Sequence, residues 1–378
     1  MVAPANEPTG AREPSRSERK AALIARRVEV QAAKEQEAAR LEAERQATAA
    51  TAARAFEIYR DVRARAARMR DAAGAGVERS PAESRLLAQL APLWDADPET
   101  IGSLRRVAPL SNVRADEYVA PTEELTLRLK RGYRIVRQQV GEALFVEESP
   151  VLGGFGYRRN GQLFNEDTLM FFHALVALDD AALLAAFRAA RPGVRHLVWE
   201  SGGGWGGFAY QFTRVCPNVT YVITAPPELL LVSAVYLATV LPQARCRFFD
   251  AASPSATWER WEESDFVFVP DSEVARFAPP RLDLTLDLGA WLSMTAGRVR
   301  DHVRHAFDLG SRYVFSVLPA RAEAADVSRV WGSIATWYWP HPVPPRAETM
   351  PAVPDDRPAE LAPDVLHAHL AGWRRMYA

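Results

Sequence analysis

The chain has 378 residues, of which 48% are hydrophobic and 25% charged, and its formal net charge is −1. This composition is typical of a globular protein with a sizeable core, and it excludes a general electrostatic attraction for nucleic acid or anionic membranes. No apolar run approaches the length of a transmembrane helix. The two cysteines, Cys216 and Cys246, match no metal-ligand spacing, and the N-terminus lacks a signal-peptide pattern. We therefore expect a cytoplasmic protein with buried thiols and no metal site.

The N-terminal part of the chain divides into two segments. Residues 1–18 are rich in Pro, Ser, Arg and Glu, and we expect them to be disordered. Residues 19–73 have the composition of one long helix, whose second half carries an apolar stripe. The stripe consists of Ala52, Phe56, Tyr59, Val62, Ala66 and Met69. It predicts packing on the protein's own domain or, as a coiled coil, on a second copy of the chain; the alternative is a solvated helix.

Residues 80–190 are mainly helical in pattern, and we expect them to form a cap or substrate region. The longest predicted helix spans Thr122–Val146, and another spans Asp179–Ala190. Between them lies a glycine-rich, aromatic loop with an expected turn at Asn160-Gly161, followed by a helix that Asn165 caps.

Residues 191–345 alternate between apolar strands and helices. Alternation of this kind predicts a Rossmann-like, doubly wound, mostly parallel α/β sheet. The expected strands are Val194–Trp199, Thr220–Thr224, Cys246–Phe249, Phe266–Val269, Leu282–Asp287 and Tyr313–Leu318, and the expected helices include 206–215, 227–241 and 295–309. Residues 346–378 are expected to form a Pro-rich arm and a short terminal helix over Asp364–Met376.

The most distinctive stretch is WESGGGWGGFAY at 199–210, where five glycines fall in six positions between an expected strand and an expected helix. Gly202, Gly204 and Gly207 satisfy the spacing Gly-x-Gly-x-x-Gly, which is a weak signal when it stands alone. Glycine permits positive φ and the close approach of a ligand, and a helix N-terminus binds anionic groups. The stretch predicts a nucleotide-cofactor site; the alternative is a loop used only for tight packing.

Glu200 discriminates between cofactors, because it ends the first strand two residues before the first glycine. A carboxylate there pairs with an amino group but repels a pyrophosphate. A dinucleotide site also requires an acid near the end of the second strand, where this chain has Thr224 and no carboxylate before Glu228. We therefore predict S-adenosylmethionine, and an NAD-dependent oxidoreductase is disfavoured. The predicted cofactor contacts are Glu200, Gly202, Gly203, Gly204, Trp205, Gly206, Gly207, Thr224, Glu228 and Asp250.

The same stretch resembles the first motif of the sugar O-methyltransferases, which are class I, Rossmann-like, S-adenosylmethionine-dependent enzymes encoded with bacterial surface-polysaccharide genes. The resemblance covers roughly residues 145–320 and includes segments 148–150, 153–154, 165–169, 217–223, 227–231 and 236–237. It implies a class I methyltransferase fold and methyl transfer to a hydroxyl of a sugar, nucleotide sugar or glycan precursor.

The chain departs from the family pattern at three polar positions. The family places Asp in the stretch equivalent to 223–226, where this chain has none. A later motif reads Ala290-Trp-Leu-Ser293-Met, with Ser293 in place of Glu, and the strand end at 317–319 lacks Asn. A ribose-binding acid contributes about 1.5–3 kcal/mol to affinity, so these departures bear on activity.

Three residues are candidates for removing the proton of the acceptor hydroxyl. Asp271 and Asp287 follow the fourth and fifth expected strands, where the cleft of a doubly wound sheet forms. His173 follows the glycine-rich loop on the next helix. The alternatives are helix caps for the two acids and a packed side chain for the histidine. His302 and His305 are weaker candidates, because they lie within a helix.

The substrate is expected to contact aromatic and basic residues of the upstream loop. Phe155 and Tyr157 offer flat faces to a sugar ring, while Arg158 and Arg159 offer guanidinium groups to the phosphates of a nucleotide sugar. A loop packed on its own domain explains the same residues equally well.

Two functions follow from these patterns. The first is an S-adenosylmethionine-dependent O-methyltransferase that acts on a sugar hydroxyl. The second is a catalytically degenerate relative that serves as a binding or scaffolding subunit, with homo-oligomerisation through the long N-terminal helix. The missing polar residues and the coiled-coil-like N-terminus favour the second; Glu200 and the glycine loop favour the first.

Overall fold

The computed structural model describes residues 50–72, 77–107, 114–140, 143–189, 194–318, 324–340 and 367–373. The expectations for residues 1–49 and for the Pro-rich stretch 346–366 lie outside these ranges. Within them, no helix combines the length and apolarity that a membrane crossing requires. Residues 52–378 form one compact unit, so the predicted helical region at 80–190 is not separate from the sheet domain.

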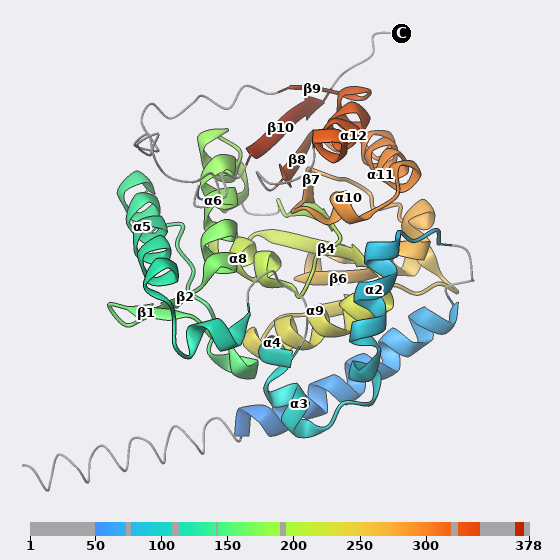
Figure 1. The fold of residues 1–378 in the computed structure, drawn as a ribbon. Helices are drawn as coiled ribbons and strands as arrows, with labels where there is room; N and C mark the ends of the chain where they lie inside the picture. Colours follow the sequence, from blue (N-terminus) through green and yellow to red (C-terminus); the bar gives the residue numbers. More distant parts are fainter. Residues whose placement is uncertain are drawn as a thin grey trace, which may run out of the picture. The chain divides into compact units, whose positions relative to one another are not determined.

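Eight strands form the central sheet (Figure 1). In spatial order they are β5 (Cys246–Phe248), β6 (Phe266–Pro270), β4 (Val219–Ala225), β3 (His196–Ser201), β7 (Leu284–Asp287), β8 (Tyr313–Leu318), β10 (His367–Trp373) and β9 (Tyr338–Pro340). The first six are parallel, as predicted. β10 runs antiparallel to both β8 and β9.

The strand order is that of a doubly wound sheet. Apart from the edge strand β5, the order β6-β4-β3-β7-β8 corresponds to 3-2-1-4-5 along the chain, and an antiparallel hairpin-like pair completes the sheet. The order reverses between β3 and β7, which is the topological switch point where such sheets bind ligands. The predicted Rossmann-like, doubly wound, mostly parallel α/β sheet is confirmed.

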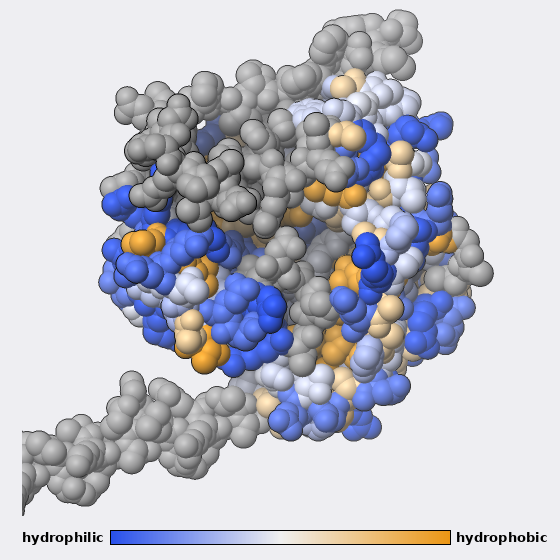
Figure 2. Space-filling model, viewed as in Figure 1, coloured by the Kyte–Doolittle hydropathy of each residue, from blue (hydrophilic) through white to orange (hydrophobic). Residues whose placement is uncertain are grey.

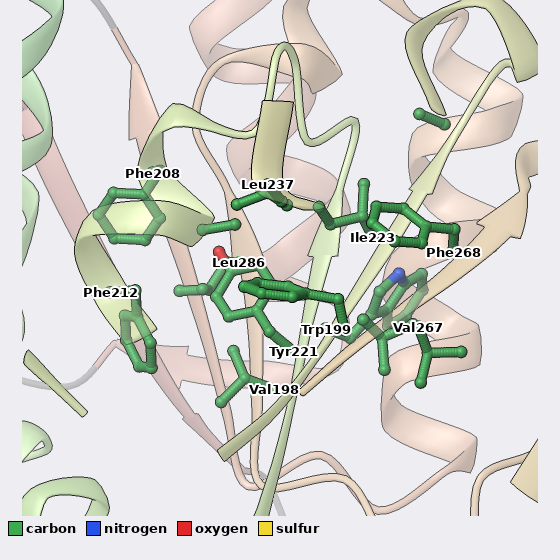
Figure 3. Packing of buried hydrophobic residues seen from close by; sticks show 14 of the residues in the cluster. Val198, Trp199, Phe208, Phe212, Tyr221, Ile223, Leu237, Val267, Phe268 and Leu286 are labelled. Atoms are coloured by element: carbon green, nitrogen blue, oxygen red, sulfur yellow. The ribbon is translucent and has the colours of Figure 1, made fainter. Parts of the chain in front are cut away.

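Helices cover both faces of the sheet. Tyr221 of β4 contacts Phe212 of α8 (Gly207–Val215). Leu237 of α9 (Pro227–Val240) lies next to Gly206, just before α8, and Figure 3 shows the packing around Tyr221 and Leu237. On the opposite face, Trp199 of β3 packs against His302 of α11 (Ala296–Asp308). The remaining elements of this half are α10 (Ala290–Ser293), α12 (Ala324–Ala335) and the short 3₁₀ helices η4 (Pro254–Trp258), η5 (Trp261–Glu263) and η6 (Asp271–Arg276).

The N-terminal half is helical and packs against the sheet domain. Its elements are a helix over 50–72, α2 (Pro81–Leu90), η1 (Ala91–Asp95), α3 (Pro98–Gly102), α4 (Leu104–Val107), η2 (Ala115–Tyr118), α5 (Glu123–Val140), η3 (Val151–Gly153), α6 (Glu166–Asp180) and α7 (Leu184–Arg188). Tyr59 and Val62 of the predicted stripe are buried in the main core, and Tyr59 donates to Leu93 O at 2.9 Å. The stripe therefore packs on the protein's own domain.

A short hairpin, β1 (Tyr157–Arg159) and β2 (Gln162–Phe164), lies beside α5 (Figure 1). Asn160 and Gly161 both have positive φ, as the predicted Asn-Gly turn requires. The hairpin and α5 share a small second core that includes Leu129, Tyr133 and Phe164. In Figure 2 the visible coloured surface is mainly hydrophilic, with apolar side chains in small separate groups.

Three predictions of helix position are wrong. The helix expected to begin at Asp179 instead continues α6 to Asp180, and only the five residues of α7 follow. The long helix expected to reach Val146 ends earlier, since residues 143–144 form a turn. The expected terminal helix is β10, because residues 367–372 pair with the free edge of β8 and this pairing overrides local helix propensity.

Candidate ligand site at the glycine loop

The glycine loop leaves the carboxyl end of β3 and enters α8, next to the switch point between β3 and β7. Gly202 donates its N–H to Thr224 O at 2.7 Å, which ties the loop to β4. α8 begins at Gly207 after Gly206, whose φ is +87°, and no side chain caps this helix. The loop therefore brings uncapped backbone N–H groups to the edge where doubly wound sheets hold anionic ligand groups.

Two glycines of the loop differ in what surrounds them. A Cβ on Gly203 would overlap Ile223 Cγ2, so this glycine is required by packing. At Gly204, φ is +48° and a Cβ would meet no atom within 4 Å. Gly204 is also only half-buried, whereas its neighbours Gly203 and Trp205 are buried. A ligand can therefore approach the loop backbone at Gly204.

A buried hydrogen-bond network holds the loop from below. Ser201 Oγ lies 2.7 Å from His302 Nδ1 and accepts from Trp291 Nε1 at 2.9 Å. Burial lowers the pKa of His302 to about 3, so its imidazole is neutral. Sequence reasoning missed this network, because Ser201 is 90 positions from Trp291 and 101 positions from His302 in the chain. His302 is thus a structural residue beneath the loop. His305 is also engaged with protein, since its Nε2 bonds the backbone oxygen of Phe277.

Glu200 is buried under the loop, with 3% of its surface exposed. Tyr221 donates its hydroxyl to Glu200 Oε2 at 3.0 Å. Burial raises the pKa of Glu200 to about 8; the Tyr221 hydrogen bond opposes that rise and the nearby Asp287 adds to it. A cationic group brought to this carboxylate would stabilise its ionised form.

Asp287 ends β7 across the switch point and is fully buried. It accepts from Ser316 Oγ at 2.7 Å and from the Trp291 N–H at 3.0 Å, so both of its oxygens bond to protein. Burial raises its pKa to about 7. The structure therefore places two buried carboxylates of perturbed pKa at adjacent strand ends, a pattern that marks candidate functional sites.

The other three predicted cofactor residues, Thr224, Glu228 and Asp250, follow or end different elements along the carboxyl edge of the sheet. Thr224 accepts from Trp199 Nε1 at 2.9 Å, so its hydroxyl is engaged on the α11 side of the sheet. Glu228 lies in the first turn of α9, half-buried, without a hydrogen bond or ion pair to any residue in the described ranges. Asp250 follows β5, which is an edge strand because β6 lies between it and β4. Among the described residues, its carboxylate accepts from the nearby Ala252 N–H. Asp271, at the end of β6, is therefore the acid that follows the neighbour of β4, while the predicted cofactor contact of Asp250 stays a prediction.

Asp271 forms part of a four-residue ion cluster. Arg79 and Arg298 donate to its carboxylate at 2.8 Å each, and both also bond Glu83 of α2. The Asp271 side chain is only 1% exposed. This cluster joins the start of α2 to β6 and α11 over the carboxyl edge of the sheet, and it leaves Asp271 committed to two guanidinium groups.

A second buried cluster joins the N-terminal helices to the glycine loop. Arg105 of α4 bonds Glu148 Oε1 at 2.9 Å, and its guanidinium carbon lies 3.4 Å from the centre of the Trp205 ring. The Tyr236 ring also packs against it, perpendicular and with its centre 4.7 Å away, and the Trp205 side chain is buried. Trp205 is therefore enclosed by protein side chains and contributes to the site through its backbone and by packing.

The remaining predicted residues lie on the α5 and α6 side. Phe155 is buried against Tyr118 and Arg105. Tyr157, Arg158 and Arg159 belong to the hairpin: Arg158 bonds Gly161 O, while Tyr157 packs on Phe164 and Arg159 on Tyr133. His173 on α6 has a buried Nε2 with no hydrogen-bond partner in the described structure, and burial lowers its pKa.

The described residues contain no cluster of three His, Cys, Asp or Glu side chains suited to a metal ion. Both cysteines are free, and burial raises their pKa values to about 12, which makes them poor nucleophiles.

Comparisons with known proteins give weak overall likenesses. Neither the protein-family models nor the curated proteins contain a match. Among solved structures, the chain is similar to magnesium protoporphyrin IX methyltransferase (ChlM) from Synechocystis PCC 6803 with bound SAM, at 11% identity and TM-score 0.32, over 68% of this chain and 99% of that one. It is also similar to the S-adenosylmethionine-dependent methyltransferase SibL, at 14% identity and TM-score 0.30, over 68% and 72%. The [4+2]-cyclase SpnF gives 11% identity and TM-score 0.31, over 58% and 74%.

Proposed function

We propose that this chain is an S-adenosylmethionine-dependent O-methyltransferase that acts on a hydroxyl of a sugar or glycan precursor. The observation that carries the proposal is the buried Glu200 carboxylate beneath an open glycine loop, at the switch point of a doubly wound sheet. A carboxylate there suits a ligand with a cationic amino group and repels a pyrophosphate. The sugar specificity rests on the motif resemblance at 199–210.

The residues present fit the proposed cofactor. Glu200 would attract the positive groups of the cofactor, and the uncapped start of α8 would bind the cofactor's carboxylate. Gly204, which has no side chain, would let the cofactor come close to the loop backbone. Glu228, which is free of other described partners, would bind the ribose hydroxyls in place of the missing acid at Thr224. When bound, S-adenosylmethionine supplies a methyl group already activated on a sulfonium.

The acceptor hydroxyl must lose a proton as the methyl group is transferred. Among the three catalytic candidates, Asp271 is bound by two arginines and Asp287 by Ser316 and Trp291. His173 keeps an unbonded ring nitrogen within the described structure and a lowered pKa, so its imidazole is neutral and able to accept a proton. We propose His173 as the base.

Calorimetry tests the proposal directly. The wild type is expected to bind S-adenosylhomocysteine and S-adenosylmethionine, and Glu200→Gln is expected to weaken S-adenosylmethionine binding roughly tenfold or more, because glutamine cannot ionise when the cationic ligand binds. Asp301→Asn, which neutralises an exposed acid on α11, serves as the control and should leave the affinity unchanged. The absence of binding by the wild type would reject the proposal.

A second candidate function is a non-catalytic binding or scaffolding protein built on this fold. The burial of Thr224, which is 1% exposed, and the two arginines on Asp271 favour it, since both positions are closed to a ligand. Purified protein incubated with labelled S-adenosylmethionine and bacterial glycan precursors separates the two candidates. Transfer of label supports the enzyme, and cofactor binding without transfer to any acceptor supports the scaffold.

A further inference from the structure

We infer that a cavity between α2, α10 and α12 binds the acceptor and selects one that carries a phosphate or carboxylate group; this inference rests on the proposed function. This cavity is a depression that is wide open to solvent, and its volume of about 420 Å³ is within the range of small-ligand sites. Its walls come from the start of α2, from residues 292–296, and from Asp326 and Arg329 of α12. No residue assigned above to the cofactor lines it.

The cavity adjoins the glycine loop through α10. A Cβ on Gly202 would overlap the Ala290 side chain, so the start of α10 lies directly against the loop. Trp291, the next residue, donates its indole N–H to Ser201. Leu292, which follows, is already part of the cavity wall. A ligand in the cavity would thus lie beyond the carboxyl end of β7, in the crevice that this fold uses for ligands.

Two arginines and one acid determine the charge of the cavity. Arg329 donates to Asp326 at 3.1 Å and to the backbone oxygens of Leu292 and Met294, so its N–H groups hold the wall in place. Arg85 is exposed, and its one hydrogen bond among the described residues runs from Nε to Pro81 O on its own helix. The terminal nitrogens of Arg85 therefore remain available to a ligand, and the cavity has an excess of one positive charge.

The neighbouring ion cluster does not cancel this charge. Arg79 and Arg298 are balanced by Glu83 and Asp271, so the cluster is neutral as a group. The free guanidinium of Arg85 is thus the uncompensated charge beside the cavity. An anionic group on the ligand would form charge-assisted, bidentate hydrogen bonds with it.

The rest of the lining suits a sugar. Ser80 and Thr295 each accept a helix N–H through the side-chain oxygen, which leaves the O–H of each free to donate to a ligand hydroxyl. Leu292, Met294 and Pro81 supply apolar wall for the C–H faces of a sugar ring. Phosphate or carboxylate on a sugar matches this combination better than a neutral sugar does.

Calorimetry with three probes tests the inference: D-glucose 1-phosphate, D-glucuronate and D-glucose, each titrated into the S-adenosylhomocysteine-loaded protein at low ionic strength. The variants are Arg85→Gln, Arg85→Lys and the control Arg300→Gln. Arg300 is an exposed arginine of α11 that does not line the cavity. Gln and Lys both preserve the helix propensity of α2, so folding is retained.

We expect at least one anionic sugar to bind the wild type and Arg300→Gln equally, about tenfold more weakly to Arg85→Gln, and with partial recovery in Arg85→Lys. Binding of D-glucose as tight as that of both anionic sugars, or binding unaffected by Arg85→Gln, would overturn the inference. So would a failure of both anionic sugars to bind. If S-adenosylhomocysteine itself binds normally in that experiment, the proposed function stands and only the cavity assignment fails.

Discussion

The indole nitrogen of Trp291 lies 2.9 Å from Ser201 Oγ, and this hydrogen bond connects α10 to the last residue of β3, where the glycine loop starts. Both side chains are fully buried. Trp291→Phe removes the donor and keeps an aromatic ring, so we expect the free energy of unfolding to fall by about 1–3 kcal/mol. Urea denaturation measures this change.

Trp258 provides a matched control for that variant. It is also buried, but its indole nitrogen has no hydrogen-bond partner within the described residues. Trp258→Phe removes an unsatisfied donor and should leave stability unchanged or slightly raised. Equal losses from the two substitutions would show that ring volume, and not the Ser201 hydrogen bond, determines the effect.

Gly204→Ala separates folding from ligand binding. The new methyl group meets no atom within 4 Å, so the cost to folding is limited to the left-handed backbone conformation, about 1–2 kcal/mol. We expect S-adenosylhomocysteine affinity to fall by at least tenfold, because the methyl group projects where the ligand approaches. Gly161→Ala in the hairpin turn has the same open surroundings at φ +83° and should cost similar stability without changing affinity.

The buried acids Glu200 and Asp287 predict an unusual pH dependence. Their pKa values rise from 4.5 and 3.8 to about 8 and about 7 on folding. Between their unfolded and folded pKa values these two groups hold protons in the folded protein that the unfolded chain has released. Their contribution to stability is therefore complete below about pH 4 and is lost as the pH rises towards 8. Each group contributes a slope on the order of 1 kcal/mol per pH unit. Urea midpoints from pH 5 to 9 should show a shallower decline in Glu200→Gln than in the wild type.

Ligand binding should be linked to the same protons. A cationic ligand next to Glu200 favours its ionised form, so binding of S-adenosylmethionine releases protons at pH 7 and tightens as the pH rises from 6 to 8. Calorimetry in buffers of different ionisation enthalpy measures the number released. An equal proton count in Glu200→Gln would assign the linkage to another group.

Asp271→Asn tests whether the ion cluster over the sheet edge is structural. Removing one acid leaves two arginines beside the single carboxylate of Glu83, and breaking such a buried cluster costs roughly 3 kcal/mol. A base role would instead reduce the catalytic rate and leave the urea midpoint intact. Asp116→Asn, at an exposed pair with Arg114, is the control and should not change the midpoint.

Sequence reasoning located the sheet strands closely, because buried parallel strands are short continuous apolar runs. The strand predicted at Tyr313–Leu318 has the bounds of β8, and the helix predicted at 227–241 matches α9 to within one residue. The predicted capping role of Asn165 is also confirmed, with its side chain accepting the Thr168 N–H at 2.9 Å. Local patterns carry this information, since each depends on neighbours within one element.

Lateral order could not be obtained in the same way. Nothing in the residues of β5 indicates that it pairs with β6 and not with β4, so the position of Asp250 beyond an edge strand could not be predicted. The environment of Asp271 depends on Arg79, which is 192 positions away in the chain. The helix predicted for 364–376 is wrong for the same reason, since β10 is a strand through its pairing with β8, which local sequence does not show.

The insertion of β10 between β8 and β9 has a consequence for how the protein forms. β10 comes later in the chain than both of its neighbours, and β9 pairs with no other strand in the described ranges. While the chain is being synthesised, the β8 edge therefore stays open until residues 367–373 leave the ribosome. The sheet is completed by the return of a late segment, so a stop codon before residue 367 would expose an unpaired strand edge and favour aggregation of the nascent protein.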